Sequence, residues 1–117
     1  MHELSVTENI LNIATKHARE ANASRVTDIN IVIGQLSSIV DESVAFYWQI
    51  ISEDTICADA KLHFNRIPAE FLCNNCKATF KLEHELAPCP HCGSALINVI
   101  SGEEFYLDSI EIERQGE

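Results

Sequence analysis

The spacing of apolar residues predicts two helices in the first half of the chain. From Ser5 to about Asn22, apolar residues recur every three or four positions, which is helical spacing. Ser5 and Glu8 match a capping box, in which two side chains satisfy backbone amides of the first turn. A second helix is predicted from an N-cap at Asp41 to about Asp54.

The second helix is expected to be mostly buried. One apolar stripe contains Trp48, which we interpret as a core residue. Further apolar residues widen that stripe. The stripe and its widening together comprise Val44, Phe46, Tyr47, Trp48, Ile50 and Ile51.

Alternating apolar and polar residues predict three strands. The first is Val26–Ile33, which ends at Gly34, and the second is Ala60–Phe64. A third runs over residues 105–112, where the alternation changes phase and predicts a bulge near Ser109.

The segment 69–101 differs from the rest because it has little continuous apolar pattern and holds four paired cysteines. Such a segment needs a metal to hold its structure. The predicted fold class is therefore α+β: a small three-stranded sheet packed with two helices, carrying an inserted zinc-ribbon-like module. One domain comprises residues 1–68 plus 102–117, and the zinc-binding domain comprises 69–101.

Composition and charge exclude several classes of function. The chain has 117 residues, 18 of them acidic and 8 basic, and a formal net charge of -10. This charge disfavours nucleic acid, which is bound largely through Lys and Arg, and favours cations or a basic protein surface. The sequence has neither the pattern of a secretory signal nor an apolar stretch of the ~20 residues that span a bilayer. We expect a cytoplasmic protein that contacts no membrane.

Two C-x-x-C pairs carry the clearest metal chemistry. The pairs are Cys73 with Cys76 and Cys89 with Cys92, and 12 residues separate them. Four thiolates in this arrangement favour a tetrahedral, structural Zn(II) site that is closed to substrate. Phe71 and Phe80 are expected to supply a small apolar core beside it.

Two catalytic interpretations of these cysteines are weaker. A redox dithiol pair opens a helix after a strand, and neither pair precedes a helical pattern. Residues 88–92 match half of the zinc deaminase signature, but the required H-x-E on an upstream helix is missing. His84 and His91 are interpreted as exposed loop residues.

The N-terminus offers a second kind of metal site. The imidazole and amide of His2, with the amine of Met1, can close two fused chelate rings around one ion. Planar nitrogen donors suit Ni(II) or Cu(II), whereas zinc prefers tetrahedral thiolates. Glu3 can supply a carboxylate or an amide for the remaining position.

These features together resemble the HypA/HybF family of hydrogenase nickel-incorporation proteins. The resemblance begins with Met1-His2-Glu3-Leu4-Ser5 and a helix, and includes a C-x-x-C pair and the knuckle Cys89 to Ser94. It extends to the end of the first strand at Ile33-Gly34, the helix with Phe46, and the strands with Ala60 to Phe64 and Ile110-Glu111-Ile112.

The resemblance implies a nickel metallochaperone, not an enzyme. It implies delivery of Ni(II) to the large-subunit precursor of nickel-iron hydrogenase, together with the GTPase HypB, and in some members support of urease maturation. It further implies that His2, Glu3 and N-terminal backbone nitrogens bind nickel, and that the four paired cysteines bind structural zinc. Some members place an acidic residue near the nickel, for which Asp41 and Glu42 are both candidates.

Two other classes of function remain. A zinc-ribbon docking adaptor for proteins is the main alternative, whereas an acid/base enzyme is disfavoured because no nucleophile-base pair is evident. Of the remaining candidate residues, Cys57 is interpreted as a small buried hydrophobe, and His17 and His63 as residues of polar faces. The sequence does not decide between a monomer and a homodimer.

Overall fold

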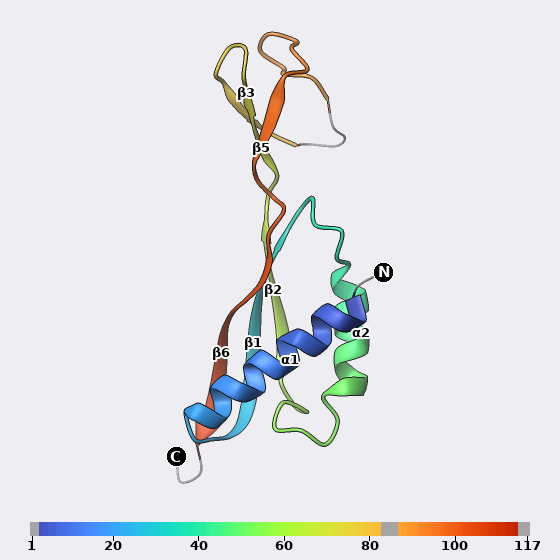
Figure 1. Ribbon diagram of the computed structural model, residues 1–117, viewed down its shortest axis with the longest axis vertical. Coiled ribbons are helices and arrows are strands. Elements are labelled where there is room, and N and C mark those ends of the chain that lie inside the picture. The colour runs from blue at the N-terminus through green and yellow to red at the C-terminus, as the bar shows by residue number, and fades with distance from the viewer. Residues whose placement is uncertain (1–2, 83–86, 115–117) are drawn as a thin grey trace.

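The chain folds into two small sheets joined end to end by a narrow neck (Figure 1). The structure is a computed structural model and describes residues 3–82 and 87–114. Its extents are 60 × 28 × 17 Å, so the molecule is strongly elongated. In chain order the elements are α1 Glu3–Glu20, β1 Ala23–Gly34, α2 Asp41–Ile51, β2 Lys61–Ile67, β3 Glu70–Cys73, β4 Thr79–Lys81, β5 Ile97–Ser101 and β6 Phe105–Arg114.

The larger sheet has the strand order β2-β1-β6. β1 pairs with β2 in parallel, through a crossover that contains α2, and with β6 in antiparallel. Asn30 lies opposite Ser109, while the next residue, Ile31, lies opposite Leu107, so Asp108 is an extra residue on β6. This confirms the bulge predicted near Ser109, and it explains the phase change in the alternation.

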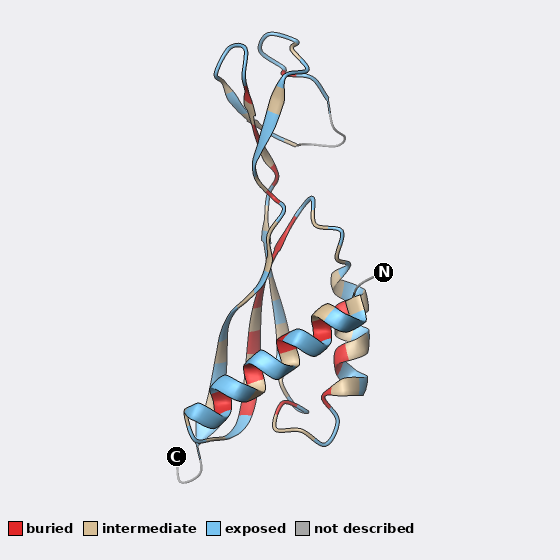
Figure 2. Cartoon of the chain, in the orientation of Figure 1, coloured by how far each residue is buried: buried red, intermediate tan, exposed pale blue. Residues whose placement is uncertain are grey.

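Both helices cover the same face of this sheet. α1 buries Ile10, Ala14 and Ala18 at the predicted helical spacing, and Figure 2 shows buried residues along both α1 and β1. The helix begins at Glu3, two residues before the predicted cap, so Ser5 lies inside the first turn and the capping box was a wrong prediction. It ends at Glu20, and Asn22, two residues later, has a positive φ of 60°, which is common just beyond a helix end.

The second helix is less buried than its sequence predicted. Val44 and Trp48 face the core, whereas Phe46 and Ile50 are 60% and 56% exposed. A helix that packs against a sheet on one side buries one stripe, so Phe46 and Ile50, on the opposite side of α2, stay exposed. The predicted cap was also wrong, because Val40 is the N-cap and Asp41 is already helical.

The sheet face away from the helices is held by polar pairs between strands. Arg25 binds Glu113 at 2.6 Å, and Asn30 Nδ2 donates to Ser109 Oγ at 3.0 Å. Between β1 and β2, His63 Nε2 lies 2.7 Å from Asp28 Oδ1, and this hydrogen bond lowers the pKa of the Asp28 carboxyl. These pairs explain why the outward positions of the strands are polar.

The neck is a hydrogen-bonded junction at the end of β1. The amide of Gly34 donates to the Glu104 carbonyl at 2.7 Å, the Gln35 amide to Ile67, and the Leu36 amide to Gly102 at 2.6 Å. The Gln35 side chain adds an acceptor for the Ala69 amide at 2.8 Å. The end of β1 therefore ties together the two strands that continue into the smaller sheet.

Glycine is required at Gly34 because the backbones approach so closely there. A Cβ at this position would lie 2.1 Å from the Gly102 carbonyl oxygen. We expect Gly34→Ala to lower the free energy of unfolding by roughly 2 kcal/mol or more, because the two backbones must separate. Urea denaturation of the metal-loaded protein measures this.

Gly93→Ala is the matched control, because a Cβ there would meet nothing within 4 Å. Only the cost of its positive φ, about 1 kcal/mol, is expected. Equal losses for the two variants would show that close approach at the neck is not what requires glycine.

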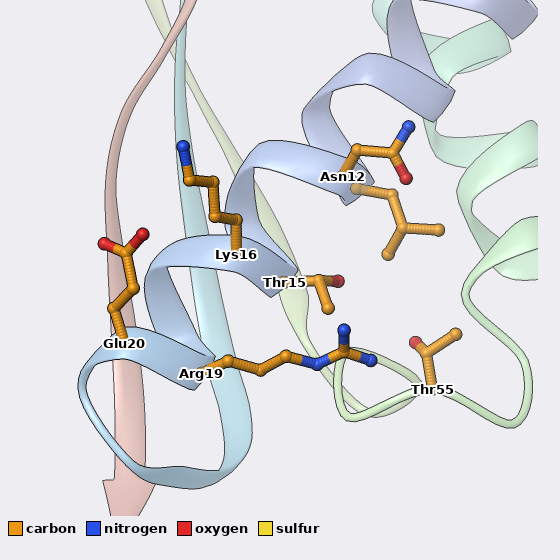
Figure 3. A pocket seen from close by; sticks show the side chains of 7 residues that line it. Asn12, Thr15, Lys16, Arg19, Glu20 and Thr55 are labelled. Carbon is orange, nitrogen blue, oxygen red and sulfur yellow. The ribbon is translucent and has the colours of Figure 1, made fainter.

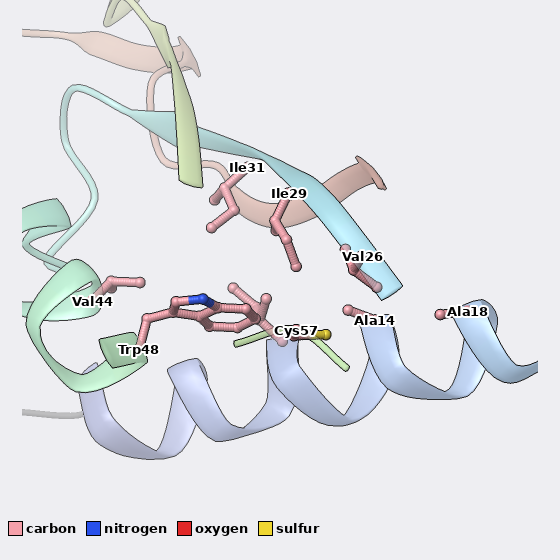
Figure 4. Close-up of a cluster of buried hydrophobic side chains, with 9 residues drawn as sticks. Ala14, Ala18, Val26, Ile29, Ile31, Val44, Trp48 and Cys57 are labelled. Carbon is pink, nitrogen blue, oxygen red and sulfur yellow. The ribbon is translucent and has the colours of Figure 1, made fainter. Parts of the chain in front are cut away.

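Trp48 supplies the largest ring of the core. Figure 4 shows its indole between Val44 and Cys57, below the isoleucines of β1. Its Nε1 is buried and donates to no described residue.

We expect Trp48→Phe to change the stability by less than about 1.5 kcal/mol, because it retains a buried ring and removes the unpaired donor. Trp48→Ala should cost about 3–5 kcal/mol. Thermal unfolding of both variants distinguishes a core ring from a residue whose N–H is needed; a large loss in the phenylalanine variant would indicate the latter.

Candidate metal centre

The four paired cysteines converge at the far end of the smaller sheet. The thiol sulfurs of Cys73, Cys76, Cys89 and Cys92 all lie within 4.8 Å of one another. The Sγ atoms of Cys73 and Cys92 are 3.5 Å apart, and those of Cys76 and Cys89 are 3.7 Å apart. Sulfurs bound tetrahedrally to Zn(II) at about 2.3 Å are separated by about 3.8 Å, so the cluster fits zinc.

Each C-x-x-C turn also directs N–H groups at its sulfurs. The Cys76 amide donates to Cys73 Sγ at 3.5 Å, and the His91 amide donates to Cys89 Sγ at 3.4 Å. The side-chain amide of Asn75 adds a donor to Cys92 Sγ at 3.7 Å. Asn75 was not among the predicted site residues, although an amide side chain between two metal-ligating cysteines is a recognisable signal for such a contact.

The two thiols of the first turn, Cys73 and Cys76, differ in their pKa values. Hydrogen bonding from the Cys76 backbone, with further donors, lowers the pKa of Cys73 to about 6. The backbone amide near Ala78 acts in the same direction on Cys76, but burial and the neighbouring thiols raise the pKa of Cys76 to about 11. The first thiol is thus a ready thiolate at neutral pH, while the second keeps its proton until a cation displaces it.

A small sheet of order β4-β3-β5 supports the cluster. The rings of Phe71 and Phe80 stack with centroids 5.5 Å apart, which confirms the predicted small core. Gly93, at φ 77°, closes the second knuckle, and its amide donates to the Cys89 carbonyl at 2.8 Å. Few other side chains in this sheet are buried, so crosslinking by a metal would add much of its stability.

The one described histidine of this region, His91, is not part of the cluster. His91 is exposed, as predicted, and its imidazole does not belong to the group of converging ligands. His84, the other histidine predicted to be exposed, lies outside the described residues. With four sulfurs converging, the centre offers no ligand position for a deaminase water.

Of the three predicted nickel ligands, the structure describes only Glu3. Met1 and His2 lie outside the described residues, whereas Glu3 is the first residue of α1 and is half-buried. The Thr7 hydroxyl donates to the Glu3 carbonyl, which fixes the first turn. α1 packs against α2, and Figure 1 shows the start of α1 beside that helix.

Two acidic residues at the start of α2, Asp41 and Glu42, were candidates for a place near the nickel. Asp41 already binds other groups of the protein. Its carboxylate forms an ion pair with Arg66 and accepts from the Glu42 amide at 2.9 Å. Glu42 is exposed on the first turn of α2. The ion pair with Arg66 links α2 to β2. The sequence analysis did not predict this ion pair.

The remaining candidates from the sequence have structural positions. Cys57 is fully buried in the core, where burial raises the pKa of its thiol, and its sulfur lies 3.9 Å from the Thr15 hydroxyl. His17 and His63 are more than half exposed on polar faces. These observations confirm all three predictions and keep the fifth cysteine apart from the metal cluster.

A surface depression of about 490 Å³ lies between α1 and the turn at Thr55 (Figure 3). Lys16, Arg19 and Glu20 line it together with hydroxyl and amide side chains. Its lining contains no nucleophile beside a general base, so it does not resemble an acid/base active site. Within the described chain, no helix is both long and apolar enough to cross a bilayer.

Comparisons with known proteins agree with this arrangement. Residues 1–112 match the family described as "Hydrogenase/urease nickel incorporation, metallochaperone, hypA". A hydrogenase maturation factor HypA from Dehalococcoides mccartyi is 43% identical over 117 residues, covering 100% of this chain and 98% of that protein. One from Caldanaerobacter subterraneus is 38% identical over 114 residues, covering 97% of this chain and all of that protein.

Solved structures show the same likeness. The solution structure of the Ni metallochaperone HypA from Helicobacter pylori matches with a TM-score of 0.64 and 26% identity, covering 98% of this chain and 100% of that one. A second HypA solution structure matches with a TM-score of 0.70 and 25% identity, covering 96% of both chains. A whole-chain match to the family, relatives of the same length and a converging four-cysteine cluster lead to one conclusion: this chain belongs to the HypA family of nickel metallochaperones.

Proposed function

We propose that this protein binds Ni(II) at its N-terminus and delivers it during the maturation of nickel-iron hydrogenase, acting as a carrier and not as a catalyst. Residues 1–68 plus 102–117 form the nickel-binding domain, and residues 69–101 form the zinc-binding domain. The observation that carries the proposal is the convergence of all four paired thiols on one centre. A centre with four protein ligands is closed, so a cargo ion that must be released needs a different site.

The zinc site consists of Cys73, Cys76, Cys89 and Cys92. When bound there, zinc crosslinks the two knuckles and stabilises the small sheet. The donors near the sulfurs, among them the Asn75 side chain, neutralise part of the negative charge that four thiolates would accumulate.

The nickel site consists of Met1, His2 and Glu3. Nitrogen donors from a chain terminus suit Ni(II), and a site with few protein ligands permits release. Glu3 supports this assignment, because its place at the start of α1 ties the terminus to the folded body. The net charge of -10 favours the capture of cations.

The proposed partners are a HypB-type GTPase and the precursor of the hydrogenase large subunit. Urease maturation proteins are further candidates, because the matching family serves both enzymes. The setting is the cytoplasm, with no role for nucleic acid or membrane. The alternative function is a zinc-ribbon docking adaptor without nickel transfer, which the exposed apolar residues of β5 favour.

Nickel titration by calorimetry tests the N-terminal site. Untagged, zinc-loaded protein is expected to bind Ni(II) stoichiometrically, because the amine and imidazole are both present. His2→Ala removes one ligand and an additional N-terminal residue displaces another, so each variant should lose at least tenfold in affinity.

Both variants must keep their zinc for this test to be valid. His63→Ala, which removes an exposed histidine that contacts Asp28 in the larger sheet, is the matched control and should bind nickel normally. Equal nickel binding by all variants, or none by the unmodified protein, would favour the adaptor.

Zinc binding is tested by metal analysis and calorimetry. One zinc per chain is expected, Cys73→Ser should lose it, and Cys57→Ala should keep it because Cys57 lies apart in the core. Retention of zinc by the Cys73 variant would contradict the four-thiolate site.

The pH dependence of zinc binding has a defined sign. The pKa of Cys73 is lowered to about 6, so this thiol is ionised at pH 7.5 and protonated at pH 5. Zinc must then displace about one more proton at pH 5, and its affinity should fall more steeply with acidity below pH 6. Calorimetry in buffers of different ionisation enthalpy counts these protons, and an unchanged count would show that Cys73 is not the acidic thiol.

A further inference from the structure

The four sulfurs of the metal centre differ in how far the protein covers them. Two of the cysteines, Cys73 and Cys89, are 0% and 3% exposed, and each accepts an N–H group from the backbone of its own turn. The other two, Cys76 and Cys92, are exposed. These two are therefore the ligands that a competing reagent reaches first.

The hydrogen bond to Cys92 comes from a side chain. Asn75 Nδ2 donates to Cys92 Sγ at 3.7 Å, so the donor belongs to one knuckle and the acceptor to the other. Among the described residues, no other amide donates to this sulfur. Cys76, the other exposed ligand, has its donor in the Ala78 backbone. A substitution at position 75 thus removes the donor of Cys92 and leaves that of Cys76 in place.

The first knuckle holds the backbone of Asn75 on both sides. Before it, the Asn74 amide donates to the Leu96 carbonyl at 2.7 Å, and after it, the Lys77 amide closes the turn with a hydrogen bond of 2.9 Å. The Asn74 side chain accepts from Asn98 Nδ2 at 3.0 Å and so contacts β5. The two neighbouring asparagines therefore have different contacts, and of the two only Asn75 donates to a sulfur.

The contact between Asn75 and Cys92 bears on the reactivity of that sulfur. A thiolate that accepts a hydrogen bond stabilises its negative charge and attacks other groups less readily. Four thiolates around one Zn(II) ion carry an excess of negative charge, so the loss of a donor makes the sulfur concerned more nucleophilic. Cys92 is exposed, and surrounding protein atoms do not shield it from such a reaction.

We propose that Asn75 is a positioning residue that holds the exposed Cys92 sulfur on the metal, and that the centre opens at Cys92 when this side chain is lost. The inference rests on the four-thiolate zinc site proposed above and deepens it, because it names the ligand whose release limits how long zinc is retained. A nickel carrier must keep its structural zinc while it handles a second metal. A side chain that slows the release of one thiolate serves this purpose.

Alkylation of the zinc-loaded full chain with iodoacetamide measures the reactivity of each sulfur. The reaction forms a carbon–sulfur bond and expels iodide, and peptide mass spectrometry at low conversion shows which cysteine has reacted. Asn75→Leu keeps a side chain of similar size without the amide. It should raise the alkylation rate of Cys92 roughly tenfold and change that of Cys76 by less than about twofold. Release of zinc to a coloured chelator should quicken in parallel.

Asn74→Leu is the matched control, because the side chain it replaces binds Asn98 and not a sulfur. Its alkylation rates should equal those of the unchanged chain, and an increase at Cys92 as large as that of Asn75→Leu would overturn the proposal. If Asn75→Leu leaves the Cys92 rate unchanged, or raises the rates of Cys76 and Cys92 equally, the inference is wrong while the zinc site stands. If the unchanged chain binds no zinc, the four-thiolate site fails and the inference fails with it.

Discussion

The end of β1 is the constraint on which the arrangement of both sheets depends. At this point, three backbone segments meet within hydrogen-bonding distance, and a side chain at Gly34 would separate them. Only two strands continue from there to the zinc-ribbon-like sheet, so their position relative to the helices is set by the amides of residues 34–36 and by Gln35. Without this junction, the smaller sheet would be connected to the larger one only through two strands, and its orientation would not be fixed by these hydrogen bonds.

The two proposed metal sites differ in how enclosed they are and in their ligand types, and both properties affect how easily a metal ion is released. The thiol cluster is enclosed by its own knuckles, with amide donors that stabilise negative sulfur. The proposed terminal site instead relies on nitrogen ligands and offers few protein ligands to the ion. The ligand types also reduce competition between the two ions, because soft thiolates and planar nitrogens select different metals. The fifth cysteine, Cys57, is buried in the core and is therefore not accessible as a further metal ligand.

Much of the fold was predictable because local patterns and tertiary packing agree. The strand periods, the bulge beside Asp108 and the convergence of the cysteines all follow from residue spacing. The errors occurred where local signals competed: Ser5 resembles a cap but lies within a helix that starts earlier, and Phe46 is apolar yet faces away from the core. Three features could not be predicted from the spacing of residues: the neck contacts, the ion pair of Arg66 and the hydrogen bond from Asn75. Each of them depends on contacts between segments that are far apart in the sequence.

The chain leaves the larger sheet for the smaller one and returns from it at adjacent points. Ala69 lies directly beside Gly102, so the excursion over residues 69–101 begins and ends in the same place. For a segment with its ends held together, the entropy of closure grows only slowly, by about 0.6 kcal/mol for each doubling of length. The larger sheet is therefore nearly indifferent to how many residues the excursion contains. Insertions and deletions beyond the neck can accumulate in evolution without disturbing the β2-β1-β6 pairing.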